Sequence, residues 1–93
     1  MNIFQTMQMY AGKWSVVGTR EFTQEEKDLV ARAEVVPSQY GLSVCFFMKN
    51  GQMGFVPLSN TSSLKEGEQV DLDKAKILTL SRPGDANIER IDI

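Results

Sequence analysis

The sequence contains no histidine and only one cysteine, Cys45, among its 93 residues. Histidine is the commonest general base and the commonest metal ligand, so its absence argues against most hydrolytic and metal-dependent enzymes. A single cysteine cannot form an internal disulfide, which fits a reducing compartment. Because its neighbours Val44 and Phe46 are apolar, we interpret Cys45 as a small buried hydrophobic residue and not as a nucleophile. We therefore predict a protein with no catalytic residues, no metal site and no cofactor.

Long apolar runs are also missing. No run of about 18 apolar residues occurs, and the first ten residues, MNIFQTMQMY, have neither a basic leader nor a continuous apolar stretch. We expect a soluble, cytoplasmic protein that does not bind membranes. The length and the apolar content of 42% suit one small globular domain spanning residues 1–93. Ten basic and twelve acidic residues give a formal net charge of −2, which argues against a protein that grips duplex phosphates.

Charge is scarce in the middle of the chain. Between Val35 and Leu64 the only charged residue is Lys49, whereas residues 65–93 are rich in both signs of charge. A stretch of this length with one charge must lie mostly in the interior or mostly in an interface.

One helix is predicted in the first half of the chain. The residues TQEE at 23–26 fit a capping box, in which Thr23 and Glu26 satisfy each other's backbone N–H groups, and a helix of about ten residues would follow. Pro37 excludes its continuation past Val36. Residues 1–11 fit either a short helix or a strand, and this alternative stays open. The predicted helix would turn three apolar residues inward: Leu29, Val30 and Ala33.

A β-hairpin is predicted at residues 43–59, SVCFFMKNGQMGFVPLS, around Asn50 and Gly51. These two residues favour a two-residue type I′ turn, which would place Phe47 opposite Gly54. The predicted core face comprises Val44, Phe46, Met48, Met53 and Phe55. The opposite, mixed face comprises Cys45, Phe47, Lys49, Gln52, Gly54 and Val56. This mixed face is expected either to be covered by the helix or to stay open for a ligand.

The remaining segments indicate further strands. We predict strands at 13–18, 75–81 and 87–93, with Pro83 and Gly84 at the centre of a type II turn. Residues 64–72, LKEGEQVDL, resemble the turn-and-strand entry of small β-barrels of the oligonucleotide-binding (OB) and SH3 kinds. The predicted fold class is α+β, mainly antiparallel β. It would be a partly open barrel or curled sheet of five to six strands, OB-like or SH3-like, with one short helix.

Two functions compete for this fold. Phe47 and Lys49 on one strand face resemble the ring and cation by which small barrels hold single-stranded nucleic acid, and Tyr40, Lys76 and Arg82 are predicted to join them. The leading hypothesis is therefore a non-catalytic binding module for single-stranded nucleic acid. The alternative is a protein-interaction or structural subunit, such as a homodimer, with residues 35–64 at the interface.

Overall fold

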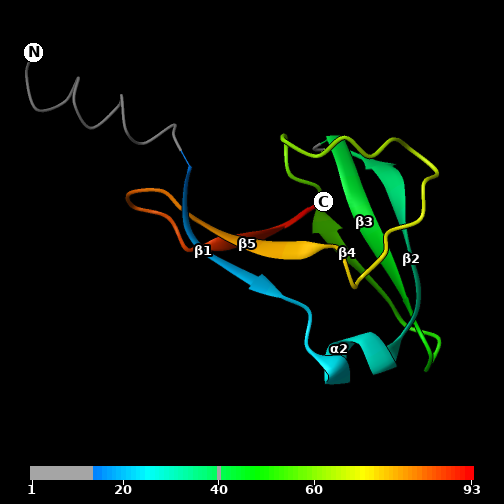
Figure 1. Ribbon diagram of the computed structural model, residues 1–93. Helices are drawn as coiled ribbons and strands as arrows, with labels where there is room; N and C mark the ends of the chain where they lie inside the picture. The colour runs from blue at the N-terminus through cyan, green and yellow to red at the C-terminus, as the bar shows by residue number, and fades with distance from the viewer. Residues whose placement is uncertain (1–13, 40) are drawn as a thin grey trace, which may run out of the picture.

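The computed structural model describes residues 14–39 and 41–93, and their elements form two three-stranded antiparallel sheets (Figure 1). One sheet has the order β1-β5-β6 and the other has the order β2-β3-β4. Among the described residues one short helix, α2, occurs, and it lies between β1 and β2 in the chain. The elements are β1 (Ser15–Glu21), α2 (Gln24–Leu29), β2 (Val30–Ser38), β3 (Gly41–Met48), β4 (Met53–Pro57), β5 (Lys76–Ser81) and β6 (Ile88–Asp92). The prediction of a mainly antiparallel β fold with one short helix is confirmed.

Backbone hydrogen bonds join the two sheets at Leu58 and Ser59, but within residues 14–39 and 41–93 the sheets do not close into a barrel. Leu58, just after β4, forms a parallel bridge with Ile91 of β6, and the Ser59 N–H donates to the Ile91 carbonyl at 2.7 Å. At the far edge of the second sheet, the segment 67–70 pairs with β2: the Val35 N–H donates to the Glu68 carbonyl at 2.8 Å. The barrel-like entry predicted at 64–72 is thus an irregular edge segment.

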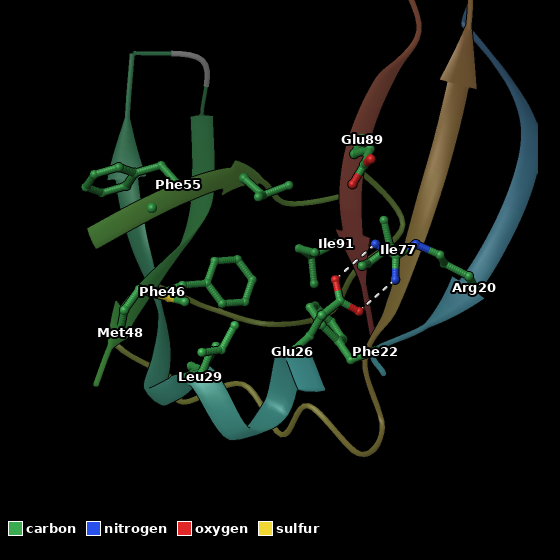
Figure 2. A pocket seen from close by; sticks show the side chains of 13 residues that line it. Arg20, Phe22, Glu26, Leu29, Phe46, Met48, Phe55, Ile77, Glu89 and Ile91 are labelled. Carbon is green, nitrogen blue, oxygen red and sulfur yellow. Dashed lines mark hydrogen bonds and ion pairs between the residues drawn. The ribbon is translucent and has the colours of Figure 1, made fainter. Parts of the chain in front are cut away.

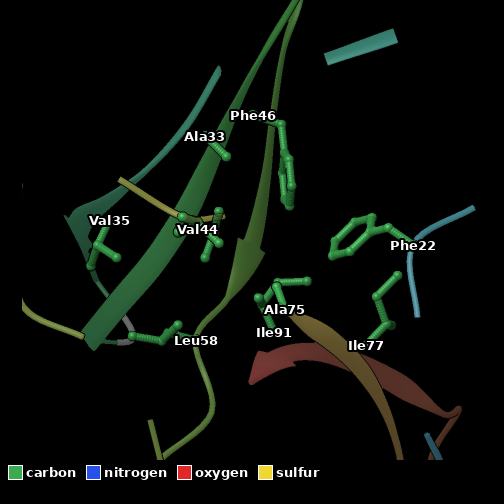
Figure 3. Close-up of a cluster of buried hydrophobic side chains, with 10 residues drawn as sticks. Phe22, Ala33, Val35, Val44, Phe46, Leu58, Ala75, Ile77 and Ile91 are labelled. Carbon is green, nitrogen blue, oxygen red and sulfur yellow. The ribbon is translucent and has the colours of Figure 1, made fainter. Parts of the chain in front are cut away.

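The core lies between the two sheets (Figure 3). The rings of Phe22 and Phe46 pack at a centroid distance of 5.9 Å, one from the segment after β1 and one from β3. Ile77 of β5 and Ile91 of β6 complete the contact from the first sheet. The buried cluster comprises Phe22, Ala33, Val35, Val44, Phe46, Leu58, Val70, Ala75, Ile77 and Ile91.

The helix starts as predicted but is shorter. In the capping box, the Glu26 N–H donates to Thr23 Oγ1 at 3.2 Å, and the Thr23 N–H donates to Glu26 Oε1 at 2.8 Å. The helix ends at Leu29 because Val30 adopts extended backbone angles and begins β2, which pairs with β3. The predicted inward position of Leu29 is wrong, since this residue is 60% exposed, and Ala33 is buried from a strand instead.

The hairpin register differs from the prediction by one residue. Gly51 has a positive φ of 89° and Asn50 does not, and the Met48 N–H donates to the Gln52 carbonyl at 2.9 Å. This is a three-residue loop, Lys49 to Gly51, with glycine in the left-handed position, and not a type I′ turn. Phe47 therefore pairs with Met53, and Phe46 pairs with Gly54. Val44, Phe46 and Met48 face the core as predicted; Met53 and Phe55 do not.

The C-terminal strands agree with the sequence prediction. β6 pairs with β5 along its whole length, from Asp92 opposite Lys76 to Ile88 opposite Leu80. In the connecting turn, the Asp85 N–H donates to the Arg82 carbonyl at 3.1 Å, and Gly84 has a φ of 83°. A positive φ at this position is what a type II turn requires of its second central residue.

Candidate functional site

The second sheet has one face that points away from the core, which we call the outer face. Side chains alternate along each strand, so the residues that flank the buried ones belong to it. Its members from β2 are Arg32, Glu34 and Val36; from β3, Ser43, Cys45 and Phe47; and from β4, Met53, Phe55 and Pro57. The inner face carries Ala33, Val35, Val44, Phe46, Gly54 and Val56. On the outer face, Met53 is 60% exposed and Phe55 is 61% exposed.

The helix does not cover this outer face. Glu26 and Leu29 of α2 line the same hollow as Phe46, whose side chain lies on the inner side of the sheet (Figure 2). No residue of α2 is buried. The alternative in which the helix packs over Phe47 is therefore wrong, and the helix instead borders the space between the two sheets.

The cation that lies on Phe47 is Arg32. Its guanidinium carbon is 3.9 Å from the ring centroid, and its Nη1 donates to Glu34 Oε2 at 2.9 Å. Arg32 was not predicted because residue 32 fell within the predicted ten-residue helix. The alternation of polar and apolar residues at 32–35, RAEV, is a strand signal that would have placed Arg32 beside Phe47.

The five residues predicted to bind nucleic acid are spread over the molecule. Lys49 is exposed in the β3–β4 loop, where its backbone N–H donates to the Leu29 carbonyl at 3.0 Å. Lys76 begins β5, in the other sheet. Arg82 follows β5, lies 4.5 Å over the Trp14 ring and forms an ion pair with Asp85. Tyr40 lies outside the described residues. Phe47 and Lys49 thus share one hairpin, whereas Lys76 lies in the opposite sheet and Arg82 in the loop after β5.

Cys45 is buried in the middle of the outer face. It pairs with Glu34 on one side and with Phe55 on the other, and only 2% of its surface is exposed. Burial raises the pKa of its thiol above the ordinary value, which lowers the population of the reactive thiolate at neutral pH. The prediction that Cys45 is a buried residue is confirmed.

An apolar hollow of about 410 Å³ lies between the sheets, beside α2 (Figure 2). Phe22, Phe46 and Ile77 are among the residues that line it, and a charged pair stands at its rim. Arg20 donates to Glu26 through two bonds, Nη1 to Oε1 at 2.8 Å and Nη2 to Oε2 at 3.1 Å. These bonds, together with the N–H of Thr23, lower the pKa of Glu26 to about 2.

Within residues 14–39 and 41–93, no three carboxylate or thiol side chains come together as a group that could hold a metal ion. Over the same residues, every helix is too short to cross a membrane. The chain matches no protein-family model, no curated protein and no solved structure. The candidate site therefore depends on its geometry alone.

Proposed function

We propose that this chain is a non-catalytic protein-interaction module and that the outer face is its binding surface. The observation that carries the proposal is the exposure of two large apolar side chains, Met53 and Phe55, which lie two residues apart on the outer face. Met53 lies opposite the half-buried Phe47, so the three side chains form one apolar area. Apolar areas left open on a sheet face are typical of protein interfaces.

The free energy of burying apolar side chains supports a binding role for Met53 and Phe55. Burying a Met or Phe side chain contributes about 1.5–3 kcal/mol relative to leaving it in water. Met53 and Phe55 gain little of this within the described chain, because each remains about 60% exposed. A protein partner that covers both side chains would recover most of that free energy. Phe, Met and Arg are also enriched at the centres of protein interfaces, and Arg32 adjoins this area.

Single-stranded nucleic acid is the second candidate ligand. The stack of Arg32 on Phe47, the exposed ring of Phe55 and the nearby Lys49 favour it. Against it, Glu34 neutralises Arg32, Lys76 lies on the other sheet, and Arg82 lies in the loop after β5. A site with so few unpaired cations has little of the counterion-release free energy that nucleic-acid binding uses.

The test is photo-crosslinking with p-benzoylphenylalanine introduced at position 55 in cells that express the chain. The matched control carries the same group at position 17, because Val17 is equally exposed, at 60%, on β1 of the other sheet. We expect a discrete protein product from position 55 and none from position 17, with the partner identified by mass spectrometry. No product at either position, or equal labelling from both, would contradict the proposal.

The nucleic-acid candidate is tested by gel shift with a single-stranded thymidine 20-mer at 50 and 200 mM salt. Binding that weakens with salt and is lost in Phe55→Ser would favour nucleic acid over protein as the ligand. We expect no shift with the parent protein at micromolar concentrations.

A further inference from the structure

The peptide groups of β4 alternate between two directions. The Met48 N–H donates to the Gln52 carbonyl at 2.9 Å, and the Leu58 N–H donates to the Leu42 carbonyl at 2.9 Å. In an antiparallel pair, residues that exchange hydrogen bonds alternate with residues that do not. Residues 52, 54, 56 and 58 therefore bond to β3, and the peptide groups of Met53, Phe55 and Pro57 point away from it.

These outward groups form an open strand edge. β4 is the last strand of its sheet, and the next outward N–H along the chain, that of Ser59, is bonded to Ile91 of β6. Among the described residues, no backbone pairing with another strand is formed by the outward side of Met53 or Phe55. Pro57 has no N–H to offer. The edge thus presents two N–H donors and their neighbouring carbonyls to an incoming strand.

The apolar hollow lies on the inner side of this edge, next to Gly54. A Cβ at Gly54 would meet nothing within 4 Å, and its φ lies outside the positive range, so neither packing nor backbone conformation within the chain requires glycine here. Gly54 instead leaves the hollow accessible from the edge. On an added antiparallel strand, the residue opposite Gly54 would project its side chain into this space, and a large apolar side chain packs well across from a strand glycine.

The charge at the rim of the hollow is negative. Arg20 is already held by both oxygens of Glu26. Glu89 of β6 also lines the hollow, and its charge helps to raise the pKa of Arg20, yet its carboxylate forms no hydrogen bond or ion pair within residues 14–39 and 41–93. With Arg20 neutralised by Glu26, one negative charge remains, and it favours a basic residue on whatever enters.

We infer that the partner of this interaction module is an extended segment of another protein that adds to β4 as an antiparallel strand. The segment places a large apolar residue opposite Gly54, in the hollow, and a basic residue beside Glu89. Backbone bonds to Met53 and Phe55 then give affinity, and the hollow gives specificity, as in other strand-addition complexes. This inference rests on the proposed function and extends the contact from the outer face to the edge and the inner side of β4.

The first experiment uses the full chain and a fluorescein-labelled peptide, KTVTFTVK, followed by fluorescence anisotropy. When its phenylalanine lies opposite Gly54, the two threonines beside it direct their N–H groups at β4, and the two valines direct theirs away. We expect N-methylation of the two threonines that flank the phenylalanine to weaken binding about 30-fold, as for the loss of two hydrogen bonds. N-methylation of both valines is the matched control and should leave binding unchanged. Equal effects of the two modifications, or no binding of the parent peptide, would overturn the inference.

The second experiment changes the protein. Gly54→Val places a β-branched side chain suited to a strand at the mouth of the hollow, where the apolar residue of the peptide would enter. We expect a folded protein by circular dichroism that binds the peptide at least tenfold more weakly. Glu89→Gln should weaken binding about threefold at low salt. If Gly54→Val abolishes binding while methylated threonines have no effect, the hollow is a simple apolar pocket and strand addition is wrong. Dimerisation of the chain that is blocked by Gly54→Val would also overturn the inference, since β4 would then receive a second copy.

The two proposals fail separately. Met53→Ser combined with Phe55→Ser removes the two exposed outer-face side chains and leaves Gly54 in place, although Phe55 also borders the hollow. If crosslinking from position 55 persists in Gly54→Val but peptide binding is absent in the parent, the interaction module stands and strand addition does not.

Discussion

The two faces of the β2-β3-β4 sheet come from the same three strands and have opposite environments. On the inner face, Val44 is fully buried and Phe46 is 7% exposed. On the outer face, Met53 and Phe55 are about 60% exposed, although they are as apolar as the inner residues. Composition alone therefore does not decide which side of this hairpin is the core.

The number of residues in the loop decides it instead. With a two-residue loop, Met53 and Phe55 would share a face with Val44 and Phe46; the three-residue loop moves the whole of β4 by one residue and reverses its faces. The core then loses two large side chains from β4 and gains Val56, while Gly54 faces the hollow. The exposed apolar area and the hollow thus share one cause.

The largest difference between the faces is expected in Phe46→Ala. Phe46 packs on Phe22 at the centre of the core, so its truncation should leave a cavity and lower the free energy of unfolding by about 3–5 kcal/mol. Urea denaturation of the variant and the parent measures this change. A loss below about 1 kcal/mol would mean that the inner face is not the core.

Substitutions of two glycines test the length of the loop and the register that follows from it. Gly51 has a φ of 89°, so Gly51→Ala should destabilise the protein by about 1–2 kcal/mol. Gly54 lies in a strand with open space around it, and Gly54→Ala should stabilise by about 0.5 kcal/mol. Thermal unfolding of both variants shows whether each substitution lowers or raises the stability of the protein. Destabilisation by Gly54→Ala would indicate the other register, in which the Phe47 ring lies across this glycine.

Local signals predicted the parts of the fold that local contacts determine. The capping box at Thr23 and the turn at Pro83 and Gly84 each satisfy their own backbone groups within a few residues, so they can be predicted from the sequence. The helix end at Leu29 could not, because the segment after it, Val30–Ser38, is held in a strand by β3. Asn50-Gly51 is compatible with both loop lengths, because each of them accepts a glycine at position 51 with positive φ.

The candidate site was predicted only in part, for the same reason. Phe47 was identified from its strand, but its cation, Arg32, comes from β2, and the pairing of β2 with β3 brings them together. Lys76 and Arg82 were expected on neighbouring strands, yet β5 pairs with β1 and β6 in a separate sheet. Strand order between distant segments leaves no local pattern in the sequence.

The ion pair at the rim of the hollow predicts a modest pH dependence. The pKa of Glu26 is lowered from 4.5 to about 2, so its contribution to stability is complete above about pH 4.5 and is lost as the pH falls toward 2. Because both side chains are more than a third exposed, solvent screening limits this contribution to about 1 kcal/mol or less. Glu26→Gln keeps a capping-box residue and removes the charge. The free energy of unfolding of Glu26→Gln, measured by urea denaturation, should be lower than that of the parent at pH 7 and equal to it near pH 2. A constant difference across this range would assign the effect to packing.

The smallest effect on stability is expected on the outer face. Met53→Ser combined with Phe55→Ser removes two side chains that are already about 60% exposed, so the free energy of unfolding should change by no more than about 0.5 kcal/mol per residue. Val16→Ser combined with Val17→Ser, at 57% and 60% exposure on β1, is the matched control and should behave alike. The two double variants should then differ only in partner binding. This is measured by photo-crosslinking with p-benzoylphenylalanine at position 47, because position 55 is substituted in the outer-face variant. The crosslink should be lost in the outer-face variant and kept in the β1 variant. Strong destabilisation by the outer-face variant alone, measured by urea denaturation, would show that Met53 and Phe55 are packed within the chain and are not available to a partner.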